Sequence, residues 1–347
     1  MKSCNKHGMA MIEIDGLQGG GQLLRTALAL SLYTGESFLM TDIRGRRSRP
    51  GLMRQHLTAI EAARQVGDAQ VQGAEAGSGT LRFEPRVLRG GNFHWPIGTA
   101  GSTTLVLQTI LPVLWKADLP STIRLEGGTH NPQAPCADFL IESFSPLMQR
   151  RGLQAEIRLE RHGFYPAGGG ELNVTVQPSK QLQPLTLRQR GELKRVSATA
   201  LISAIPGLVA ERELASVQRY LRLNADQLHH RQARPVSGPG NALMVKVESE
   251  QVCEIFTAFG EKRVSAERVA ELVCNEARAY LAADVAVGAH LADQLLLPLA
   301  LAGGGEFSTL APTEHARTNA ALIEKFLPVE IDFREEKADH WLAIVSD

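Results

Sequence analysis

His315 is the residue of this chain best placed for chemistry on a phosphate group. It follows Pro312 and a triple glycine at residues 303–305, and it precedes Thr318 and Asn319, where an amphipathic segment begins. A neutral imidazole beside a glycine turn and a helix start could attack phosphorus or carry a proton. A structural role is the alternative, because a single histidine is more often structural than catalytic.

Residues 44–54 form the densest group of charges, with five arginines and no acidic residue. Arginine can bind phosphate through two parallel hydrogen bonds, so this composition favours a phosphate site over a solvated loop. A Pro-Gly pair then leads into a predicted helix over residues 52–66, which carries Arg54, Gln55 and His56. The positive N-terminal end of that helix would face the arginines.

Three runs of three glycines, at residues 19–21, 168–170 and 303–305, stand in similar sequence contexts. Glycine permits positive φ and close approach to the backbone, and amides exposed before a helix can bind an anion. The three runs suggest a repeated fold whose loops meet around a phosphate.

Three nearly apolar helices are predicted to begin near residues 21, 101 and 291. A helix that is apolar all round is typically buried. Each of these helices nevertheless carries polar residues near its start or middle: Gln22 and Arg25 in the first, Gln108 in the second, Asp293 and Gln294 in the third.

A second, amphipathic helix follows each apolar one, over about residues 52–66, 137–151 and 318–326, and alternating strand patterns come next. We therefore predict an α/β (α+β) fold of three repeated units, each with two helices against a four-stranded sheet in the order βαβαββ. The patterns of residues 185–275 break this rhythm. We predict a large domain over residues 1–184 and 276–347, and a smaller inserted α/β domain over residues 185–275.

Composition and charge narrow the class of protein. The chain has 347 residues, of which 44% are hydrophobic, and its 37 basic and 37 acidic residues cancel. A nucleic-acid contact would therefore be a local patch. Neither an export signal nor a membrane span is evident, and Cys4, Cys136, Cys253 and Cys274 form no C-x-x-C pair. We expect a cytoplasmic chain with reduced thiols and without a membrane partner or structural zinc site.

Known nucleotide-binding motifs are missing from the chain. It has no Walker A sequence and no G-x-G-x-x-G after a strand. Residues 13–16 contain the Asp-Gly of lysine-dependent nucleotidyltransferases but not the lysine, so an adenylylated nitrogen would come from elsewhere. The segment at residues 130–132, after a glycine pair, predicts a loop with an Asx-type turn, and a nucleotide base could pack on Pro132.

Residues 161–172, which read Arg-His-Gly-Phe-Tyr-Pro-Ala-Gly-Gly-Gly-Glu-Leu, match the signature of the RNA 3'-terminal phosphate cyclases. Further matches follow in order over nearly the whole chain, at residues 15–25, 50–58, 101–108, 131–135, 260–267 and 291–294. By these matches the chain is identified as a member of that family. The resemblance implies three repeated units with an inserted α/β domain, a fold related to the enolpyruvyl transferases.

The resemblance also implies an ATP-dependent enzyme that acts on RNA 3'-phosphate ends. A histidine attacks the α-phosphorus of ATP, giving histidyl-AMP and pyrophosphate. AMP then passes to the RNA 3'-phosphate, and the adjacent 2'-OH displaces it to form a 2',3'-cyclic phosphate. A divalent metal, Mg²⁺ or Mn²⁺, would assist.

Residue by residue, the resemblance assigns the nucleophile to His315 and the RNA phosphate contacts to Arg44 and Arg47. The positions that would contact ATP or AMP are Arg25, Gln55, Gln108, Pro132, His290, Leu291, Ala292, Asp293 and Gln294. The metal ligands stay unknown, because residues 15–22 are two residues shorter than the family pattern and lack its glutamate. His290 stands where the family commonly has a tyrosine.

Two alternatives stay open. The first is a silent or impaired relative that acts as an RNA-binding scaffold in ribosomal RNA processing; His315 argues against it, and the absent glutamate leaves room for it. The second is an enolpyruvyl transferase, for which a longer chain with two large similar domains is expected. The sequence leaves the oligomeric state open, with a homodimer as one option.

Overall fold

The computed structural model describes residues 11–17, 19–179, 181–235 and 238–347. Cys4, named above among the scattered cysteines, lies outside the described residues. Within these ranges no helix is both long and apolar enough to cross a membrane.

Three of the four sheets share one plan. In each, the first strand runs parallel to the second, the fourth lies antiparallel beside the second, and the third lies antiparallel at the edge beside the fourth. Each also has one helix after its first strand and a second helical segment after its second strand. The predicted repeat of two helices on a four-stranded sheet is therefore confirmed.

The first unit consists of β1 (Ile12–Asp15), α1 (Gly21–Thr34), β2 (Phe38–Thr41), α2 (Arg54–Val66), β3 (Gln70–Gln72) and β4 (Leu81–Glu84). The second consists of β5 (Asn92–Pro96), α3 (Thr103–Leu114), β6 (Ser121–Gly127), α4 (Ala137–Phe139), the π-helical turn η1 (Leu140–Phe144), α5 (Ser145–Gln149), β7 (Ala155–Arg161) and β8 (Gly170–Val176). The helix expected over residues 137–151 is thus interrupted by a π-helical turn.

The third unit consists of β9 (Leu185–Leu187), α8 (Ala289–Leu301), β14 (Gly305–Thr309), α9 (Glu314–Phe326), β15 (Glu330–Lys337) and β16 (His340–Ser346). The fourth sheet belongs to a different arrangement: β10 (Leu193–Ser203), α6 (Gly207–Leu221), the 3₁₀ turn η2 (Ala225–Gln227), β11 (Leu228–Gln232), β12 (Gly240–Ser249), β13 (Cys253–Phe259) and α7 (Ala266–Ala283). Its strand order is β11-β10-β12-β13.

Strand pairing corrects the boundaries expected for the inserted segment at residues 185–275. β9 pairs in parallel with β14, so Leu185–Leu187 belong to the sheet of the third unit. At the other end, α7 continues to Ala283. The sequence pattern missed this because β9 has only three residues and its partner lies about a hundred residues further along the chain.

Two further expectations are wrong in detail. α9 begins at Glu314 rather than near residue 318, because the Thr313 side chain accepts a hydrogen bond from the Ala316 amide at 3.0 Å and caps the helix. The glycine triplets are not equivalent: one precedes α1, one leads into β8, and one joins α8 to β14. They therefore do not mark one repeated position of the unit.

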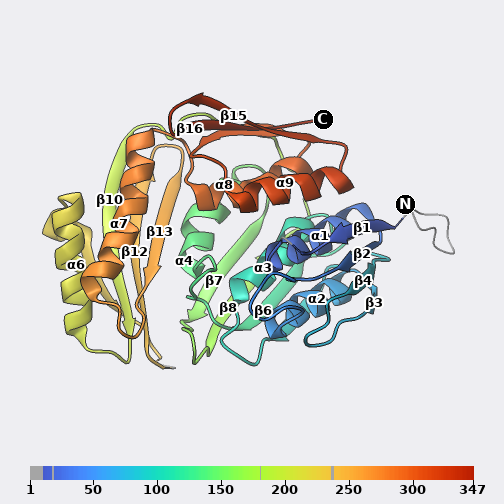
Figure 1. Cartoon of the computed structure of the whole chain (residues 1–347), viewed down its shortest axis with the longest axis horizontal. Coiled ribbons are helices and arrows are strands. Elements are labelled where there is room, and N and C mark those ends of the chain that lie inside the picture. The colour runs from blue at the N-terminus through green and yellow to red at the C-terminus, as the bar shows by residue number, and fades with distance from the viewer. Residues whose placement is uncertain (1–10, 18, 180, 236–237) are drawn as a thin grey trace.

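The helices of the three repeated units pack against one another, and their sheets lie on the outside (Figure 1). α1 contacts α2, α3 and α9, and α8 contacts α9. Fully buried leucines of α1, α3 and α8 (Leu24, Leu28, Leu107, Leu295 and Leu296) join one core that spans the three units, while the fourth unit has a smaller core of its own. The apolar helices predicted to be buried thus form the centre of the molecule.

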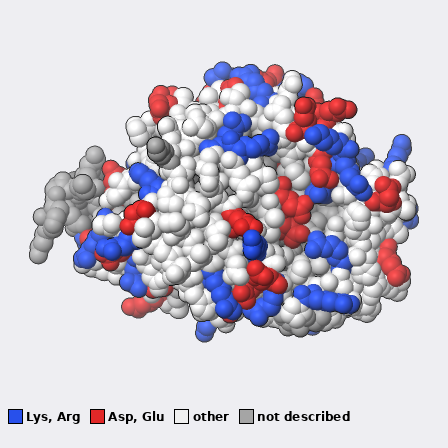
Figure 2. Space-filling model, turned by 180° about the vertical axis from the view of Figure 1, so that it is seen from behind, with Lys and Arg blue, Asp and Glu red and all other residues white. Residues whose placement is uncertain are grey.

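Surface charges are mixed rather than segregated on the face turned away from Figure 1. Figure 2 shows basic and acidic side chains interspersed over that face. This is in keeping with the equal numbers of the two kinds in the sequence.

Glu254 of β13 links the fourth unit to the start of α8. Its side chain is 1% exposed, and its Oε1 accepts a hydrogen bond from the Gly288 amide at 2.5 Å. Burial raises the pKa of this carboxyl to about 8, and the hydrogen bond offsets only part of that effect.

Stability should therefore depend on pH through Glu254. The folded chain holds a proton on Glu254 that the unfolded chain releases between about pH 4.5 and pH 8, so the free energy of unfolding should fall as pH rises through that window. The loss is at most roughly 1.4 kcal/mol per pH unit. Glu254→Gln keeps an acceptor for the Gly288 amide but does not titrate. Its free energy of unfolding, measured by urea unfolding at several pH values, should therefore fall less with pH than that of the wild type. Glu250→Gln, at an exposed turn, is the control, and identical slopes for wild type and E254Q would contradict the expectation.

Candidate active site

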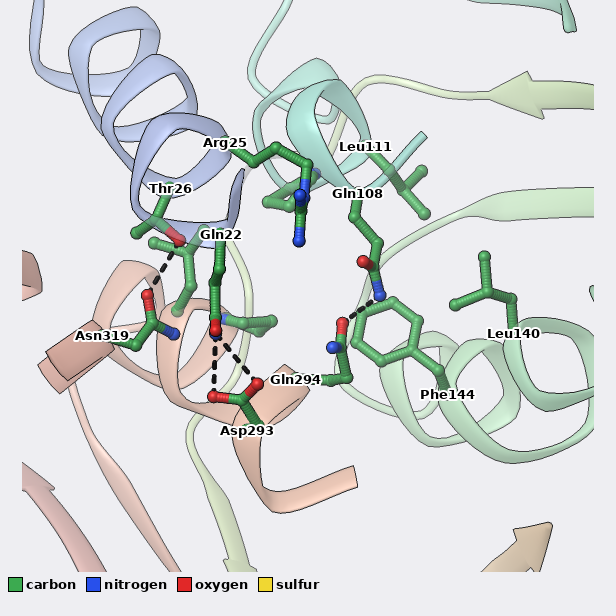
Figure 3. Close-up of a pocket in the computed structure, with 13 residues that line it drawn as sticks. Gln22, Arg25, Thr26, Gln108, Leu111, Leu140, Phe144, Asp293, Gln294 and Asn319 are labelled. Carbon is green, nitrogen blue, oxygen red and sulfur yellow. Dashed lines mark hydrogen bonds between the residues drawn. The ribbon is translucent and has the colours of Figure 1, made fainter. Parts of the chain in front are cut away.

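A small pocket of about 50 Å³, open to solvent, lies where the helices of the three units meet. Figure 3 shows the side chains that line it: they come from α1, α3, α8, α9 and the η1 turn. The polar residues noted in the three apolar helices all line this pocket: Gln22, Arg25, Gln108, Asp293 and Gln294. Their convergence follows from the repeat, which turns the corresponding helix of each unit toward the centre.

A chain of hydrogen bonds connects Asp293 to His315 through Gln22. The Gln22 Nε2 donates to both carboxylate oxygens of Asp293, at 2.8 and 2.9 Å. The Gln22 Oε1 lies 2.8 Å from Nδ1 of His315. The carboxylate accepts only, so it fixes which end of the amide is the nitrogen. The amide oxygen then requires a proton on Nδ1, and in the neutral imidazole Nε2 keeps the lone pair.

α9 is fixed on α1 by a second buried contact. The Thr26 hydroxyl donates to Oδ1 of Asn319 at 2.8 Å. Asn319 lies one turn beyond His315 in α9, so this bond sets the rotation of the helix that carries the imidazole. Across the pocket, the Gln108 amide donates to the Gln294 amide oxygen.

Arg25 supplies the positive charge of the pocket. Its guanidinium extends into the space between α1 and α3 (Figure 3), and among the described residues it has no hydrogen bond or ion pair at contact distance. Burial lowers the pKa of Arg25 to about 10, and the charge of Asp293 partly offsets this. A cation with free donors in a pocket suits an anionic ligand.

The pKa of Asp293 is also set by opposing effects of burial and neighbouring groups. Burial raises the pKa of its carboxyl, and the Gln22 hydrogen bond followed by the nearby charges of His315 and Arg25 oppose the rise. Asp293 is the one carboxylate among the described residues that line the pocket.

His56 is a residue of this region for which the sequence suggested no separate role. It is 3% exposed, and its Nδ1 accepts from the Met53 amide at 3.0 Å, so the proton of the neutral ring is on Nε2. Burial lowers the pKa of His56 to about 3, with the charges of Arg25 and Arg44 adding to the effect. A β-carbon on Gly21 would lie 2.5 Å from this Nε2, so only glycine lets the ring approach the start of α1 so closely.

The arginine segment divides into residues with different roles. Arg44 donates from Nη1 to the carbonyl oxygens of Arg49 and Gly51, both at 2.8 Å, so part of its guanidinium holds the loop together. Arg47 is exposed, and its Nη2 would lie 3.0 Å from a β-carbon on Gly20, just before α1. The structure thus brings Arg47, but not the whole segment, to the end of α1 that points toward the pocket.

The other predicted site residues are spread around the pocket. Gln55 accepts from the Ser102 amide at 3.4 Å and so joins α2 to the start of α3. His290 is exposed on α8, 3.8 Å from Glu276, and Pro132 is exposed in its loop. The side chains of Leu291 and Ala292 are buried in the core and do not line the pocket. Of the run His290–Gln294, only the last two residues do so.

The predicted divalent metal can be tested against this donor set. The side chains that line the pocket include the Asp293 carboxylate and the amides of Gln108 and Gln294, which can offer oxygen to a metal ion. Mg²⁺ commonly binds through one or two carboxylates together with substrate phosphates and water, so the donor set fits such an ion. The one group of three or more metal-ligating side chains found among the described residues lies elsewhere, at His130, Cys136 and Asp138.

Comparison with known proteins identifies the family of this chain. Residues 17–333 match the family described as RNA 3'-terminal phosphate cyclase. The chain is 50% identical over 339 residues to the RNA 3'-terminal phosphate cyclase of Salmonella enteritidis PT4 (97% of this chain, 99% of that one). It is 51% identical over 324 residues to that of Pseudomonas fluorescens Pf-5 (93% and 94%) and 48% identical over 336 residues to that of Koribacter versatilis (96% and 95%).

Three repeated α/β units surround a central pocket that holds Arg25 and Asp293, and His315 lies at its edge. The chain belongs to the RNA 3'-terminal phosphate cyclase family, which confirms the prediction from its motifs. Among solved structures, the enolpyruvyl transferase NikO from Streptomyces tendae matches at a TM-score of 0.36 and 10% identity, over 95% of this chain and 47% of that chain. A similarity this low carries no argument, so the relation to enolpyruvyl transferases stays a prediction.

The tautomer of His315 can be tested directly. In the neutral imidazole the proton should be on Nδ1, because the Gln22 oxygen accepts it. Two-bond ¹H–¹⁵N correlation spectra of histidine-labelled protein distinguish the two nitrogens. Gln22→Leu should shift the ring toward the Nε2-protonated form, while Gln294→Leu, which removes a pocket amide with no bond to His315, should not. A wild-type ring protonated on Nε2 would contradict the assignment.

Proposed function

We propose that this chain uses ATP to convert RNA 3'-phosphate ends into 2',3'-cyclic phosphates through a covalent adenylate on His315. The observation that carries the proposal is the hydrogen-bonded chain from Asp293 through Gln22 to Nδ1 of His315. It leaves the Nε2 lone pair of a neutral imidazole available beside a pocket that holds the free guanidinium of Arg25, which is what a nucleophilic histidine requires.

In the first step, Nε2 of His315 attacks the α-phosphorus of ATP. A nitrogen–phosphorus bond forms, the bond to the bridging oxygen breaks, and pyrophosphate leaves with that electron pair. The Nδ1 proton stays on the ring, and its bond to the Gln22 oxygen stabilises the positive charge that the imidazole gains. The carboxylate of Asp293 supports this charge through the same amide.

In the second step, an oxygen of the RNA 3'-phosphate attacks the phosphorus of the adenylate, and His315 leaves as the neutral imidazole. In the third, the 2'-OH attacks the 3'-phosphorus, AMP leaves, and the hydroxyl proton passes to solvent. Activation is needed because a phosphate oxygen alone is a poor leaving group, whereas AMP is a good one.

The remaining predicted residues have proposed roles around this reaction. Arg25 offsets the charge on the transferred phosphoryl group, and Arg47, near the start of α1, extends the positive region toward the RNA phosphates. The free nitrogens of Arg44 contribute to the same region. Gln55 and Gln108 position the phosphate, and Pro132 and His290 offer surfaces on which the adenine can pack.

We further propose roles for α8 and for the metal. Leu291 and Ala292 act through their backbone and hold Asp293 and Gln294 in place. Bound Mg²⁺ or Mn²⁺ would neutralise charge on the ATP phosphates, and Asp293 with the pocket amides would hold it. We also propose that the chain works in the cytoplasm and that residues from β10 to α7 form its inserted domain.

A silent or impaired RNA-binding scaffold is the second candidate, and one observation favours it. The segment at residues 15–22 lacks the glutamate and two residues of the family pattern. Glu13 is on β1 ahead of that segment, so it does not replace the missing side chain.

Adenylylation at His315 separates the two candidates. ATP labelled at its α-phosphate should label the wild-type chain in the presence of Mg²⁺ or Mn²⁺. His315→Asn should abolish labelling, and His94→Asn, at an exposed histidine on β5, should leave it unchanged. The bond should be labile to acid and stable to alkali, as a phosphoramidate is. A folded wild-type chain that takes no label would leave the scaffold as the better proposal.

The proposed role of Arg25 predicts that the rate of label formation falls in steps from wild type to the lysine and then the alanine variant. Arg25→Ala should lower the rate of label formation about 100-fold, in line with the loss of one preorganised charged donor at the reacting group. Arg25→Lys should fall between this variant and wild type, because it keeps the charge but not the planar fork. Arg64→Ala, which removes an exposed arginine of α2, is the matched control. A wild-type rate in the alanine variant would refute the assignment.

A further inference from the structure

His130, Cys136 and Asp138 bring three different metal-ligating atoms within 4.8 Å of one another, and all three residues are buried. The scattered cysteines of the sequence indicated no structural zinc site. The fold changes this interpretation, because it brings one of the cysteines together with a histidine and an aspartate across a short loop. The group is separate from the pocket, since none of its members lines it.

The loop is held in shape by backbone hydrogen bonds before any ligand is considered. The amides of Thr129 and His130 both donate to the carbonyl oxygen of Gly163, at 2.8 and 3.0 Å, and the Ala137 amide donates to the carbonyl oxygen of Thr129 at 2.9 Å. The segment is thereby closed on itself, with Cys136 at the N-cap of α4 and Asp138 in its first turn. Ligands held by a rigid backbone need little ordering on binding.

His162, the residue before Gly163, stands next to this group as a candidate fourth donor, outside the three residues whose ligating atoms come within 4.8 Å of one another. Its ring centroid lies 5.3 Å from that of His130. Its Nε2 is buried and has no hydrogen-bond partner among the described residues. A buried, unpaired nitrogen is costly unless it has a partner, and a metal ion would supply one.

Neighbouring side chains orient the donors in the way that metal sites require. Nδ1 of His130 is 2.9 Å from the Thr129 hydroxyl, which leaves Nε2 to face the group. That Nε2 is 2.8 Å from Oδ2 of Asp138, while the other carboxylate oxygen lies 3.5 Å from Arg231. The Cys136 sulfur is 3.5 Å from the Thr257 hydroxyl.

We propose that His130, Cys136, Asp138 and His162 bind one Zn²⁺ ion. Two nitrogens, a thiolate and a carboxylate form a four-donor set of the kind that zinc accepts in closed, structural sites. Binding replaces the His130–Asp138 hydrogen bond by two metal bonds. His130 changes tautomer, so that its proton is on Nδ1 and is donated to the Thr129 hydroxyl while Nε2 binds the ion. The thiol proton of Cys136 passes to solvent. Thiolate and carboxylate together balance the charge of the ion, which lowers the cost of placing it in a buried site.

The position of this site gives the ion a structural role. Its donors belong to the second unit, but Arg231 is on β11 and Thr257 is on β13 of the fourth unit. α4 and η1 also pack directly on β13. The ion therefore fixes the fourth sheet against the second unit, and holds the loop that carries Pro132.

Cobalt titration tests the site independently of any enzymatic activity. The chain, first treated with a chelator, should bind one equivalent of Co²⁺ and develop visible bands of a four-coordinate ion together with a near-ultraviolet thiolate-to-cobalt absorption. Zn²⁺ should displace the Co²⁺ and abolish these bands, and Zn²⁺ should raise the thermal unfolding temperature.

Variants of the donors and of a remote cysteine complete the test. Cys136→Ser should lose the thiolate absorption and bind Zn²⁺ at least about tenfold more weakly, and His162→Asn should weaken binding while keeping that absorption. Cys274→Ser, at another buried cysteine, should behave as wild type. If Cys136→Ser does not fold, His130→Asn, for which weaker binding is also expected, is measured in its place. Wild-type protein that binds no Co²⁺, or binds it without the thiolate absorption, would overturn the proposal and leave a metal-free network of His130, Asp138 and Arg231.

Discussion

The packing of α1, α3 and α8 at the centre of the molecule is the constraint on which the rest of the structure depends. Each helix is apolar on nearly all sides, and none can be covered by its own four-stranded sheet alone. The three units bury them by turning them toward one another, with the sheets outside. The few polar residues that these helices carry must then find partners in the centre, and the pocket is where they do so.

The pairing of these polar residues also sets the electrostatics of the site. Arg25 and Asp293 are both partly removed from water, and each lowers the cost of the other's charge without forming a direct ion pair. The Asp293 carboxylate instead accepts hydrogen bonds from the Gln22 amide nitrogen, and the amide oxygen of Gln22 contacts Nδ1 of His315. The guanidinium stays free for an anion, and the imidazole is held in one tautomer. A direct Arg25–Asp293 bond would remove both properties.

The fourth unit influences the position of α8 and therefore of the pocket. It follows β9 and precedes α8, so the chain leaves the third unit and returns just before the helix that carries Asp293. Two contacts limit how the fourth unit can move: the buried one of Glu254 with the Gly288 amide, and the ion pair of the half-exposed Arg231 with Asp138. The placement of Asp293 therefore depends on contacts far from the pocket.

The sequence by itself determined much of this protein, because its signals are local. Helix periodicity and the run of motifs over residues 15–294 predicted the repeat, the family and the polar residues that line the pocket. Most of the corrections concern long-range pairing. No local pattern reveals that β9 pairs with β14 or that Leu291 and Ala292 point into the core, whereas the Thr313 cap of α9 is a local signal that periodicity alone overlooks. The Gln22 bridge, the neutral His56 beside Gly21 and the joining of His130 with Cys136 were likewise decided by the tertiary structure alone, since each joins side chains whose distance depends on how the whole units pack.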